Sequence, residues 1–551
     1  MTRVMVVGGA GVFGSRLVDG LAATTDACVI VAGRNRAKCD DAARAARARY
    51  PTASIETATV DIRTTTPADL RASGARIVVD AAGPFQGAKP RLAKVAIAAQ
   101  LDYLDLADAR DFVARFPELD DAARAAGVVA VTGMSSTPAL SHAVLDSLTV
   151  GWQRIDRVEV GISPGNRAPR GRSIVAAILA WAGQPLPVFV GGAWASRRGW
   201  SGTITRPIGG LGTRKLALAE TPDLDLLVTR FRPRDAAWFR AGLELGTLHH
   251  GLALLAWLPR LGLPRGLSFL EGLIRRISSA AEGFGTDRGG MIVEAAGKDA
   301  QNRPTVATWT LVAEAGDGPN VPTLPALALI RELMTNRAAV PIGARTGAGL
   351  LSLDVIGNEF SRLRINTHRS TVHPVAPFEV AVQEDFEKLP EVVRAAHRAG
   401  PVTRLAGSVR IEGAESMIGA LVARLFGFPA STDNEHVQVV MRLERDGTEV
   451  WERDFGGQKF RSRLRPSRSG MVIERFGPFS FDLSVEAAAD GLTLRVVGGR
   501  LGNVRLPRWL APKSTAIESA DIDGRFSFDV PIALPVMGRL VRYRGSMNVV
   551  G

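Results

Sequence analysis

A short apolar segment followed by a run of glycines at the start of the chain most constrains the fold. Residues Arg3–Val7 are apolar enough for a buried strand, and a helix-like stretch runs from Ser15 to Ala23. The segment between them contains the pattern GxGxxG. In that pattern one glycine makes a tight turn, one lets backbone N–H groups approach a pyrophosphate, and one allows close helix–strand packing. The run therefore predicts a dinucleotide-binding turn, made by Gly8, Gly9, Gly11, Val12, Phe13 and Gly14.

The end of the second expected strand indicates which dinucleotide binds. Residues 28–32 form that strand, and an NAD-specific site would usually place Asp or Glu directly after it. This chain has no acid there and instead reads Gly33-Arg34-Asn35-Arg36, with Arg34 twenty residues after Gly14. A guanidinium suits a 2′-phosphate by charge and by bidentate geometry. We therefore predict NADP rather than NAD, held by Arg34, Asn35 and Arg36; the alternative is that these are exposed residues at the start of a helix.

Strands and helices continue to alternate up to about residue 131. Strands are expected at 55–61, 76–82, 103–106 and 128–131, with helices at 39–50 and 89–100. Such alternation predicts a doubly wound parallel sheet, in which ligands lie beyond the carboxyl ends of the strands. Ala82, Gly83 and Pro84 are then expected to line the nicotinamide side of the cofactor. Asp105 and Ser135 follow two further strands and are expected nearby.

Four segments carry a resemblance to a known family. They are Gly8–Gly14, Ala81-Ala82-Gly83-Pro84-Phe85, Tyr103-Leu104-Asp105 and Gly133-Met134-Ser135-Ser136-Thr137-Pro138. They resemble the NADP-binding part of the saccharopine dehydrogenase-like (saccharopine reductase-like) family, over about residues 1–150 and more loosely beyond. The resemblance implies a Rossmann domain, NADP as cofactor and an NAD(P)-dependent oxidoreductase. Residues 285–291 and 309–313 also look like bacterial proteins of this type.

The resemblance does not imply saccharopine as substrate. Saccharopine-forming members carry an Asp in the loop that matches Gly133–Pro138, where this chain has Ser135. The broad family includes lipid-related reductases, so an apolar or lipid-like substrate is the expectation. Ser135 and Asp105 are the candidate catalytic residues. The alternative for Asp105 is a structural carboxylate whose hydrogen bonds are all satisfied.

The middle of the chain, residues 151–365, is expected to be an α+β substrate and dimerisation domain. A hairpin is predicted around residues 297–303, a helix at 324–335, and a turn-rich basic segment at 163–171 before a helix at 173–182. That basic segment could bind an anionic group, although an ordinary surface turn is the stronger interpretation. His249 and His250 are adjacent and would point about 100° apart on a helix, so no metal site is predicted.

Residues 252–276 are strongly apolar and flanked by arginines. Leu252–Pro259 and Leu267–Leu270 are the apolar runs, beside Arg260, Arg265, Arg275 and Arg276. This pattern suits peripheral contact with a membrane surface or a lipid-lined pocket. A buried helix pair or a homodimer interface would give the same pattern.

The C-terminal part, residues 378–551, is expected to be an antiparallel β-rich domain, curved or barrel-like, behind a linker at 367–377. Asp446-Gly447 between two alternating segments is a strong hairpin signal. Through Trp451, Arg453, Phe455, Tyr543 and Gly545 the segment resembles an uncharacterised bacterial domain often fused behind this dehydrogenase type. Its expected role is to enclose an apolar ligand, with Trp451 and Tyr543 in the core or in the cavity wall.

Charge does not indicate a partner. The chain has 68 basic and 55 acidic residues, a formal charge of +13, but both signs are spread along its whole length and aromatic residues are only 6%. A nucleic-acid partner is therefore not expected. Cys28 and Cys39 cannot cross-link so large a chain, no signal peptide is evident and no apolar run approaches the roughly 20 residues of a membrane span. The expected location is the cytoplasm, with peripheral contact at the inner membrane.

Two functions are consistent with these patterns. The first is an NADP-dependent reductase of an apolar or lipid-like small molecule, built from a Rossmann domain at 1–150, a substrate domain at 151–365 and a β-rich domain at 378–551. The second is a non-catalytic dinucleotide-sensing or lipid-handling protein that retains the fold, because a fold alone does not establish catalysis.

Overall fold

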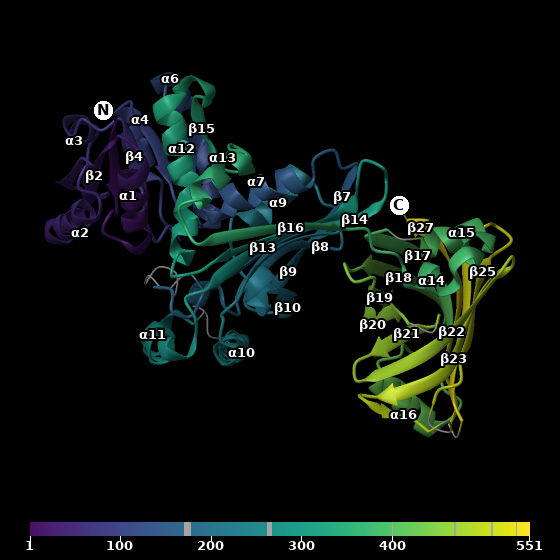
Figure 1. Cartoon of the computed structure of the whole chain (residues 1–551). Coiled ribbons are helices and arrows are strands. Elements are labelled where there is room, and N and C mark those ends of the chain that lie inside the picture. The colour runs from purple at the N-terminus through teal and green to yellow at the C-terminus, as the bar shows by residue number, and fades with distance from the viewer. Residues whose placement is uncertain are drawn as a thin grey trace. The chain divides into compact units, whose positions relative to one another are not determined.

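The computed structural model describes residues 1–169, 178–261, 267–398, 400–467, 470–507, 511–535 and 537–550. The chain divides into two compact units. The first comprises Met1–Val150, Arg157–Ala295 and Ala307–Ser370, and the second comprises Gly151–Asp156, Ala296–Val306 and Thr371–Gly551. The first unit contains a parallel sheet and most of a mixed sheet, and the second contains a closed antiparallel barrel (Figure 1). This α/β plus β-rich architecture confirms the predicted fold class.

The parallel sheet has seven strands in the order β15-β6-β5-β4-β1-β2-β3. Sequential strands leave β1 in opposite directions, toward β2 on one side and β4 on the other, which makes the sheet doubly wound. Its strands are β1 (Arg3–Val7), β2 (Cys28–Gly33), β3 (Ile55–Thr59), β4 (Ile77–Asp80), β5 (Asp102–Asp105), β6 (Val129–Thr132) and β15 (Gly343–Thr346). Its helices are α1 (Val12–Thr24), α2 (Arg36–Arg49), α3 (Pro67–Ala72), α4 (Arg91–Ala98), α5 (Arg110–Arg115), α6 (Asp120–Ala126) and α7 (Ser141–Leu148).

Strand β1 is buried on both faces, which explains its continuous apolar sequence. Val4 and Val6 belong to one core cluster together with Leu17 of α1. Met5 and Val7 belong to a second cluster on the other side of the sheet. The two core clusters therefore hold β1 from both faces of the sheet, and the glycine-rich turn directly follows its carboxyl end.

The seventh strand of the parallel sheet comes from far along the chain. β15 pairs with β6, with Ala344 opposite Ala130. The helix α12 (Leu324–Thr335) precedes it and contributes Leu327 and Ile330 to the same core as β1. This segment lies within residues 151–365, which were expected to form the substrate domain. Position along the chain does not reveal which sheet a late strand joins.

The mixed sheet has nine strands, in the order β10-β11-β12-β7-β13-β14-β16 with β8 and β9 attached through β12. Its strands are β7 (Arg154–Ser163), β8 (Pro185–Val190), β9 (Ala193–Arg198), β10 (Ile204–Pro207), β11 (Thr213–Leu218), β12 (Ala236–Ala241), β13 (Gly289–Lys298), β14 (Pro304–Ala313) and β16 (Ile365–Val372). Its accompanying helices are α9 (Asp223–Phe231), α10 (Gly246–Leu255) and α11 (Glu271–Ala280), whereas α13 (Leu353–Gly357) contacts α12 and α7 beside the parallel sheet. The start of the predicted helix 173–182, the end of the basic segment 163–171, and residues 262–266 with Arg265 lie outside the described residues.

The predicted linker at 367–377 is wrong over its first part, which is strand β16. Its eight residues are mostly polar and most of them are exposed. β16 is the last strand in the order of the mixed sheet. An edge strand that is solvated on both faces shows no alternation of apolar and polar residues, so hydrophobic periodicity could not reveal it.

In the second unit, antiparallel strands close into a barrel because β22 pairs with both β21 and β23. The strands are β17 (Val402–Glu412), β18 (Thr432–Leu443), β19 (Glu449–Phe455), β20 (Gln458–Pro466), β21 (Val472–Phe476), β22 (Phe479–Ala488), β23 (Gly491–Leu501), β24 (Val504–Arg505), β25 (Thr515–Ala520), β26 (Phe526–Leu534) and β27 (Gly538–Val550). Helices α14 (Pro377–Val382), α15 (Glu391–His397) and α16 (Met417–Leu425) accompany them (Figure 1). Closure removes the free sheet edges and leaves an interior.

Candidate cofactor site of the parallel sheet

The glycine-rich turn after β1 is packed too closely to admit side chains at three of its positions, Gly8, Gly9 and Gly14. Gly8 has a φ of +84°, and a Cβ there would lie 2.7 Å from the carbonyl carbon of Ala81. At Gly14 a Cβ would lie 2.1 Å from the carbonyl oxygen of Gly8. Both obstacles are backbone atoms, which cannot move aside as a flexible side chain could. The turn therefore requires glycine for its own geometry, as GxGxxG predicts.

The same turn leads directly into the N-terminus of α1. Gly11 is the N-cap residue, and no side chain caps the helix. The first backbone N–H groups of a helix, here those of Val12, Phe13 and Gly14, have no acceptor within the helix. Uncapped N–H groups behind a bare glycine backbone fit a pyrophosphate. The sequence-predicted set from Gly8 to Gly14 is thus brought together in one cradle.

Of the three residues predicted to hold a 2′-phosphate, Arg34 has the free side chain. It is exposed after β2, and within the described part of the chain it makes no hydrogen bond or ion pair. Asn35 caps α2, and its Oδ1 accepts the N–H of Lys38 at 3.0 Å. Arg36 pairs with Asp40, with 3.0 Å between Nε and Oδ1. Roles for Asn35 and Arg36 in cofactor binding stay predictions, and each side chain already has a structural partner.

A second guanidinium lies near Arg34 and was missed by sequence reasoning. The N–H of Val60 donates to the carbonyl oxygen of Gly33 at 3.1 Å, which joins the loop after β3 to the end of β2. In that loop Arg63 pairs with Asp61 at 2.7 Å. The Arg63 hydrogen bonds, with a smaller contribution from the charge of Arg34, lower the pKa of Asp61 to about 2. Arg63 could have been found only from the strand order, because twenty-nine residues separate it from Arg34.

The loop after β4 lies against the glycine-rich turn. Ala82, Gly83 and Pro84 are exposed, while Phe85 is buried against Phe112 with 5.2 Å between ring centroids. A Cβ on Gly8 would approach the Cα of Ala82 to 2.8 Å. The three exposed residues therefore sit beside the phosphate cradle, anchored by a buried ring. This placement is compatible with the predicted nicotinamide-lining role, which stays a prediction.

Asp105 lies at the end of β5 and holds the neighbouring loops together. Its side chain is fully buried. Its oxygens accept hydrogen bonds from the backbone N–H groups of Gly133 and Ala107, at 2.8 and 3.0 Å, and from the hydroxyls of Thr132 and Tyr103, at 2.8 and 3.1 Å. Burial raises the pKa of Asp105 to about 6. Its catalytic role stays a prediction, and these contacts support the alternative of a satisfied structural carboxylate.

Ser135 lies in the loop after β6 that Asp105 holds. Its backbone N–H donates to the carbonyl oxygen of Gly133 at 2.8 Å, and its own carbonyl oxygen accepts the N–H of Leu140 at 3.1 Å. Within the described residues its hydroxyl makes no hydrogen bond. The side chain is 7% exposed. Ser135 therefore keeps an uncommitted hydroxyl, which is compatible with its predicted role near the reaction centre.

A carboxyl that sequence reasoning missed lies beside these loops. Gln86, from the loop after β4, donates to Asp108 at 3.2 Å, and the carboxylate of Glu220 accepts the backbone N–H of Arg110 at 3.1 Å. Burial, with the charge of Asp108 as a further cause, raises the pKa of Glu220 to about 7. Such a group can hold or release a proton at neutral pH. Glu220 follows β11 in the mixed sheet, so only tertiary structure brings it here.

The described residues contain no group of three or more His, Cys, Asp or Glu side chains arranged to hold a metal ion. His249 and His250 have their rings 5.8 Å apart at 87°, and they approach Thr203 and Lys215 respectively.

Cys28 and Cys39 are both buried, and neither forms a disulfide. Within the described part of the chain, no helix is long and apolar enough to cross a membrane.

Burial of Asp80 makes the stability of the parallel sheet depend on pH. Its Oδ1 accepts the Ala82 N–H at 3.0 Å, and burial raises its pKa to about 7 from an ordinary value of 3.8. Between these values the folded chain keeps a proton that the unfolded chain loses. The stabilisation is therefore complete below about pH 4 and disappears as pH rises through 7.

We expect Asp80→Asn, which retains the acceptor for Ala82, to remove this pH dependence. Between pH 4 and 7 the free energy of unfolding of the wild type should fall more steeply than that of Asp80→Asn, by up to about 1.4 kcal/mol per pH unit. Urea unfolding at pH 5, 6 and 7 measures the difference. Asp26→Asn, at an exposed position, is the matched control and should follow the wild type. Parallel curves for Asp80→Asn and the wild type would contradict the buried, protonated Asp80.

Comparison with known families agrees with the geometry of the parallel sheet. Residues 4–131 match the model described as saccharopine dehydrogenase NADP binding domain. This segment is therefore similar to the NADP-binding domain of saccharopine dehydrogenases. The expected family resemblance is thereby confirmed, and the chain is an oxidoreductase of this type with NADP as its cofactor. The bare cradle and the free Arg34 are the features of the NADP-binding domain that fit that cofactor.

Comparison with solved structures finds dehydrogenases and reductases. Saccharopine dehydrogenase (L-Glu forming) from Saccharomyces cerevisiae matches with a TM-score of 0.48 and 14% identity, over 68% of this chain and 100% of that one. Sorbitol-6-phosphate 2-dehydrogenase from Erwinia amylovora matches with a TM-score of 0.20 and 17% identity, over 23% and 69%. Menthone neomenthol reductase from Mentha piperita matches with a TM-score of 0.14 and 19% identity, over 15% and 32%. No curated protein matches the chain.

The C-terminal barrel matches a different family model. Residues 389–547 match a model described only as a domain of unknown function (DUF4166). The expected fusion of the NADP-binding domain to an uncharacterised β-rich domain is confirmed. The family description assigns no chemistry to the barrel.

Proposed function

We propose that the protein is an NADP-dependent reductase that transfers hydride to an apolar, lipid-like small molecule. The observation that carries the cofactor assignment is the free guanidinium of Arg34 at the end of β2, beside a strand end without an acid. The bound nicotinamide would supply the hydride. The pyrophosphate would lie on the cradle, and the nicotinamide side would be lined by Ala82, Gly83 and Pro84.

The chain's own part in the reaction is to bind, orient and supply a proton. Asp105 and Asp80 hold the loops after β4, β5 and β6 in place through the hydrogen bonds described above. Ser135 supplies a hydroxyl that can polarise an acceptor group. Glu220 supplies a carboxyl that exchanges its proton near pH 7, because burial raises its pKa to about 7. We propose Ser135 and Glu220 as the polar groups that face the substrate.

Direct titration with the two cofactors tests this function. Quenching of protein fluorescence by NADPH and by NADH, measured on the full chain, should show clearly tighter binding of NADPH. Absence of NADPH binding at high micromolar concentration, or a preference for NADH, would refute the role of Arg34.

The apolar character of the substrate is supported by a surface around α10 and α11. Leu254, Trp257, Phe269, Leu273 and Ile277 are between 47% and 73% exposed. They surround a small core in which Leu252 and Leu267 are buried. Exposed apolar side chains gathered in one segment mark a contact surface. We propose that this surface makes peripheral contact with a membrane, from which an apolar substrate could be taken.

Flotation with anionic liposomes tests the membrane contact. The double variant Trp257→Ser/Phe269→Ser should lose most of its co-flotation, because each exposed apolar ring that inserts contributes to binding. Val150→Ser, at an exposed apolar position outside this surface, is the matched control and should float like the wild type. Unchanged flotation of the double variant would contradict the proposal. Dissociation of a dimer in the double variant, seen by sedimentation, would assign the surface to a homodimer instead.

A further inference from the structure

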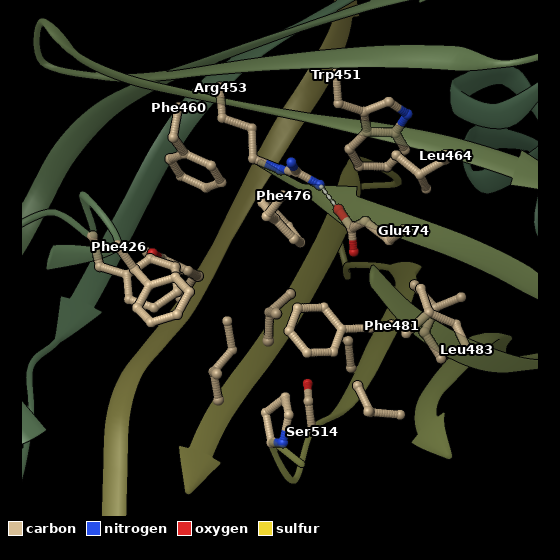
Figure 2. A pocket seen from close by; sticks show the side chains of 18 of the residues that line it. Phe426, Trp451, Arg453, Phe460, Leu464, Glu474, Phe476, Phe481, Leu483 and Ser514 are labelled. Carbon is tan, nitrogen blue, oxygen red and sulfur yellow. Dashed lines mark hydrogen bonds and ion pairs between the residues drawn. The ribbon is translucent and has the colours of Figure 1, made fainter. Parts of the chain in front are cut away.

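The barrel of the second unit encloses a large apolar cavity. Its volume is about 830 Å³, within the range of roughly 300–1,000 Å³ typical of ligand pockets. Aliphatic side chains and aromatic rings make up most of its wall, and Figure 2 shows the rings of Phe426, Phe460, Phe476 and Phe481. A packed protein core leaves few voids larger than a water molecule. A cavity of this size is therefore a feature of the barrel's design rather than a packing defect.

Exposure of the inward-facing side chains supports the same interpretation. Phe460, Phe481 and Val496 line the cavity, yet each is only partly buried. Alternate residues of a barrel strand face inward, so a filled interior would bury these side chains completely. Their accessible surface faces the cavity. Apolar surface left in contact with water is unfavourable, and an apolar ligand would remove it from water.

The charged groups in the wall are few and each has a partner; Arg461, for example, is ion-paired with Glu452. Arg453 donates to Ser462 at 2.8 Å and pairs with Glu474, with 3.3 Å between Nη2 and Oε1 (Figure 2). His397 lies 2.5 Å from Glu518. Both carboxylates in the wall thus face a cationic partner or a group that can become one. A ligand with its own charge would find no free counter-ion beside these pairs, whereas an uncharged oxygen can hydrogen-bond to the Arg453–Glu474 pair.

An apolar helix lies at one end of the cavity. Leu425 and Phe426, at the end of α16, line the cavity although Leu425 is 84% exposed. The Phe426 ring lies 5.1 Å from that of Phe479, which pairs with Leu501 across β22 and β23. Leu501 also lines the cavity and is 45% exposed. Wall residues that are this exposed mark the mouth of the cavity.

Helix α16 carries its apolar face outward beside this mouth. Met417, Ile418, Leu421 and Leu425 are between 64% and 91% exposed and recur at the spacing of one helical face. Soluble proteins rarely expose such a stripe without a use for it. An apolar molecule could contact this stripe before it enters the cavity.

We propose that the barrel binds one long-chain, largely apolar molecule whose polar end is an uncharged alcohol or ester, with α16 forming the entrance. The chain of this ligand lies among the aromatic rings. Its oxygen hydrogen-bonds to the Arg453–Glu474 pair. This site is independent of the NADP-binding domain, and its test needs no cofactor.

Displacement of a fluorescent probe from the full chain tests the site. An anthroyloxy-labelled long-chain alcohol should bind the wild type, and unlabelled hexadecanol should displace it more effectively than palmitate. Val496→Trp places an indole ring in the cavity and should weaken binding of the probe at least about 10-fold, because the ring occupies volume that the ligand would fill. Val497→Trp, the next residue on β23, is 54% exposed and is the matched control; it should bind like the wild type.

Two further variants guard against misfolding and test the polar end. Leu494→Trp, also in the wall, repeats the test against exposed Arg495→Trp, with thermal unfolding as a check on each. Glu474→Gln leaves Arg453 without its counter-ion and should shift preference toward palmitate by about 10-fold. Failure of the wild type to bind the probe, or equal binding by both members of each tryptophan pair, would overturn the site. An unchanged alcohol-to-acid preference in Glu474→Gln would overturn the assignment of the polar end.

Discussion

Replacing Arg34 by Asp is expected to lower affinity for NADPH about 100-fold while changing affinity for NADH by much less. A guanidinium on a phosphate makes charge-assisted hydrogen bonds, and reversing its charge places a carboxylate beside the 2′-phosphate. A loss of about 2.7 kcal/mol corresponds to this factor. NADH carries a hydroxyl at that position, and this hydroxyl can donate a hydrogen bond to the carboxylate of Asp. Fluorescence titration of the purified full chain with both cofactors measures the ratio.

Arg36→Gln is the matched control for this prediction. Arg36 lies two residues from Arg34 and is also exposed, but its guanidinium pairs with Asp40. We expect Arg36→Gln to change NADPH affinity by no more than about 3-fold, as for other surface ion pairs. Arg63→Gln should give an intermediate loss, because Arg63 lies in the neighbouring loop and pairs with Asp61. Equal losses of NADPH and NADH in Arg34→Asp would show that Arg34 does not read the 2′-phosphate.

Gly14→Ala is expected to disrupt the turn itself. Its Cβ would lie 2.1 Å from the Gly8 oxygen and 2.9 Å from the Gly9 Cα, so the turn and α1 must move apart. Forcing atoms into packed structure usually costs about 1–3 kcal/mol. Binding of NADPH should disappear together with this stability, because the cradle is made by the same backbone. Thermal unfolding and cofactor titration on the same sample measure both effects.

Gly11→Ala separates binding from stability. A Cβ on Gly11 would lie 3.1 Å from the Gly8 oxygen, a contact that a small shift relieves. The expected result is a Tm close to that of the wild type with weakened NADPH binding, since the new methyl group occupies the approach of the pyrophosphate. If Gly14→Ala kept both its Tm and its affinity, the close packing of α1 on the turn would have no functional role.

Much of the NADP-binding domain could be predicted from local sequence. The apolar run of β1 and the glycines after it specify a buried strand and a side-chain-free turn, because both depend on neighbours in the chain. Arg34 was recognisable for the same reason, since it directly follows β2. Of the two arginines near the expected 2′-phosphate, local sequence indicated only Arg34. Arg63 lies in the next loop, and its proximity comes from the pairing of β3 with β2.

Other parts of the site escaped sequence reasoning because they depend on distant contacts. Glu220 follows a strand of the mixed sheet, and its raised pKa comes from burial and from the charge of Asp108. Asp105 was recognised as a candidate, but its four donors come from two loops and two strands that only the fold assembles. The sequence of β16 does not alternate between apolar and polar residues, because neither face of this edge strand is buried.

The sequence by itself determined the strand–glycine–helix unit, the absence of an acid after β2 and the β-rich character of the C-terminal part. These follow from backbone geometry and from side chains within a few residues of one another. Tertiary structure alone decided that β15 completes the parallel sheet and that Arg34, not Arg36, is free. It also decided that the last domain closes around a cavity. Each of these depends on which distant segments pack together, and burial, ion pairing and enclosed volume exist only after the chain has folded.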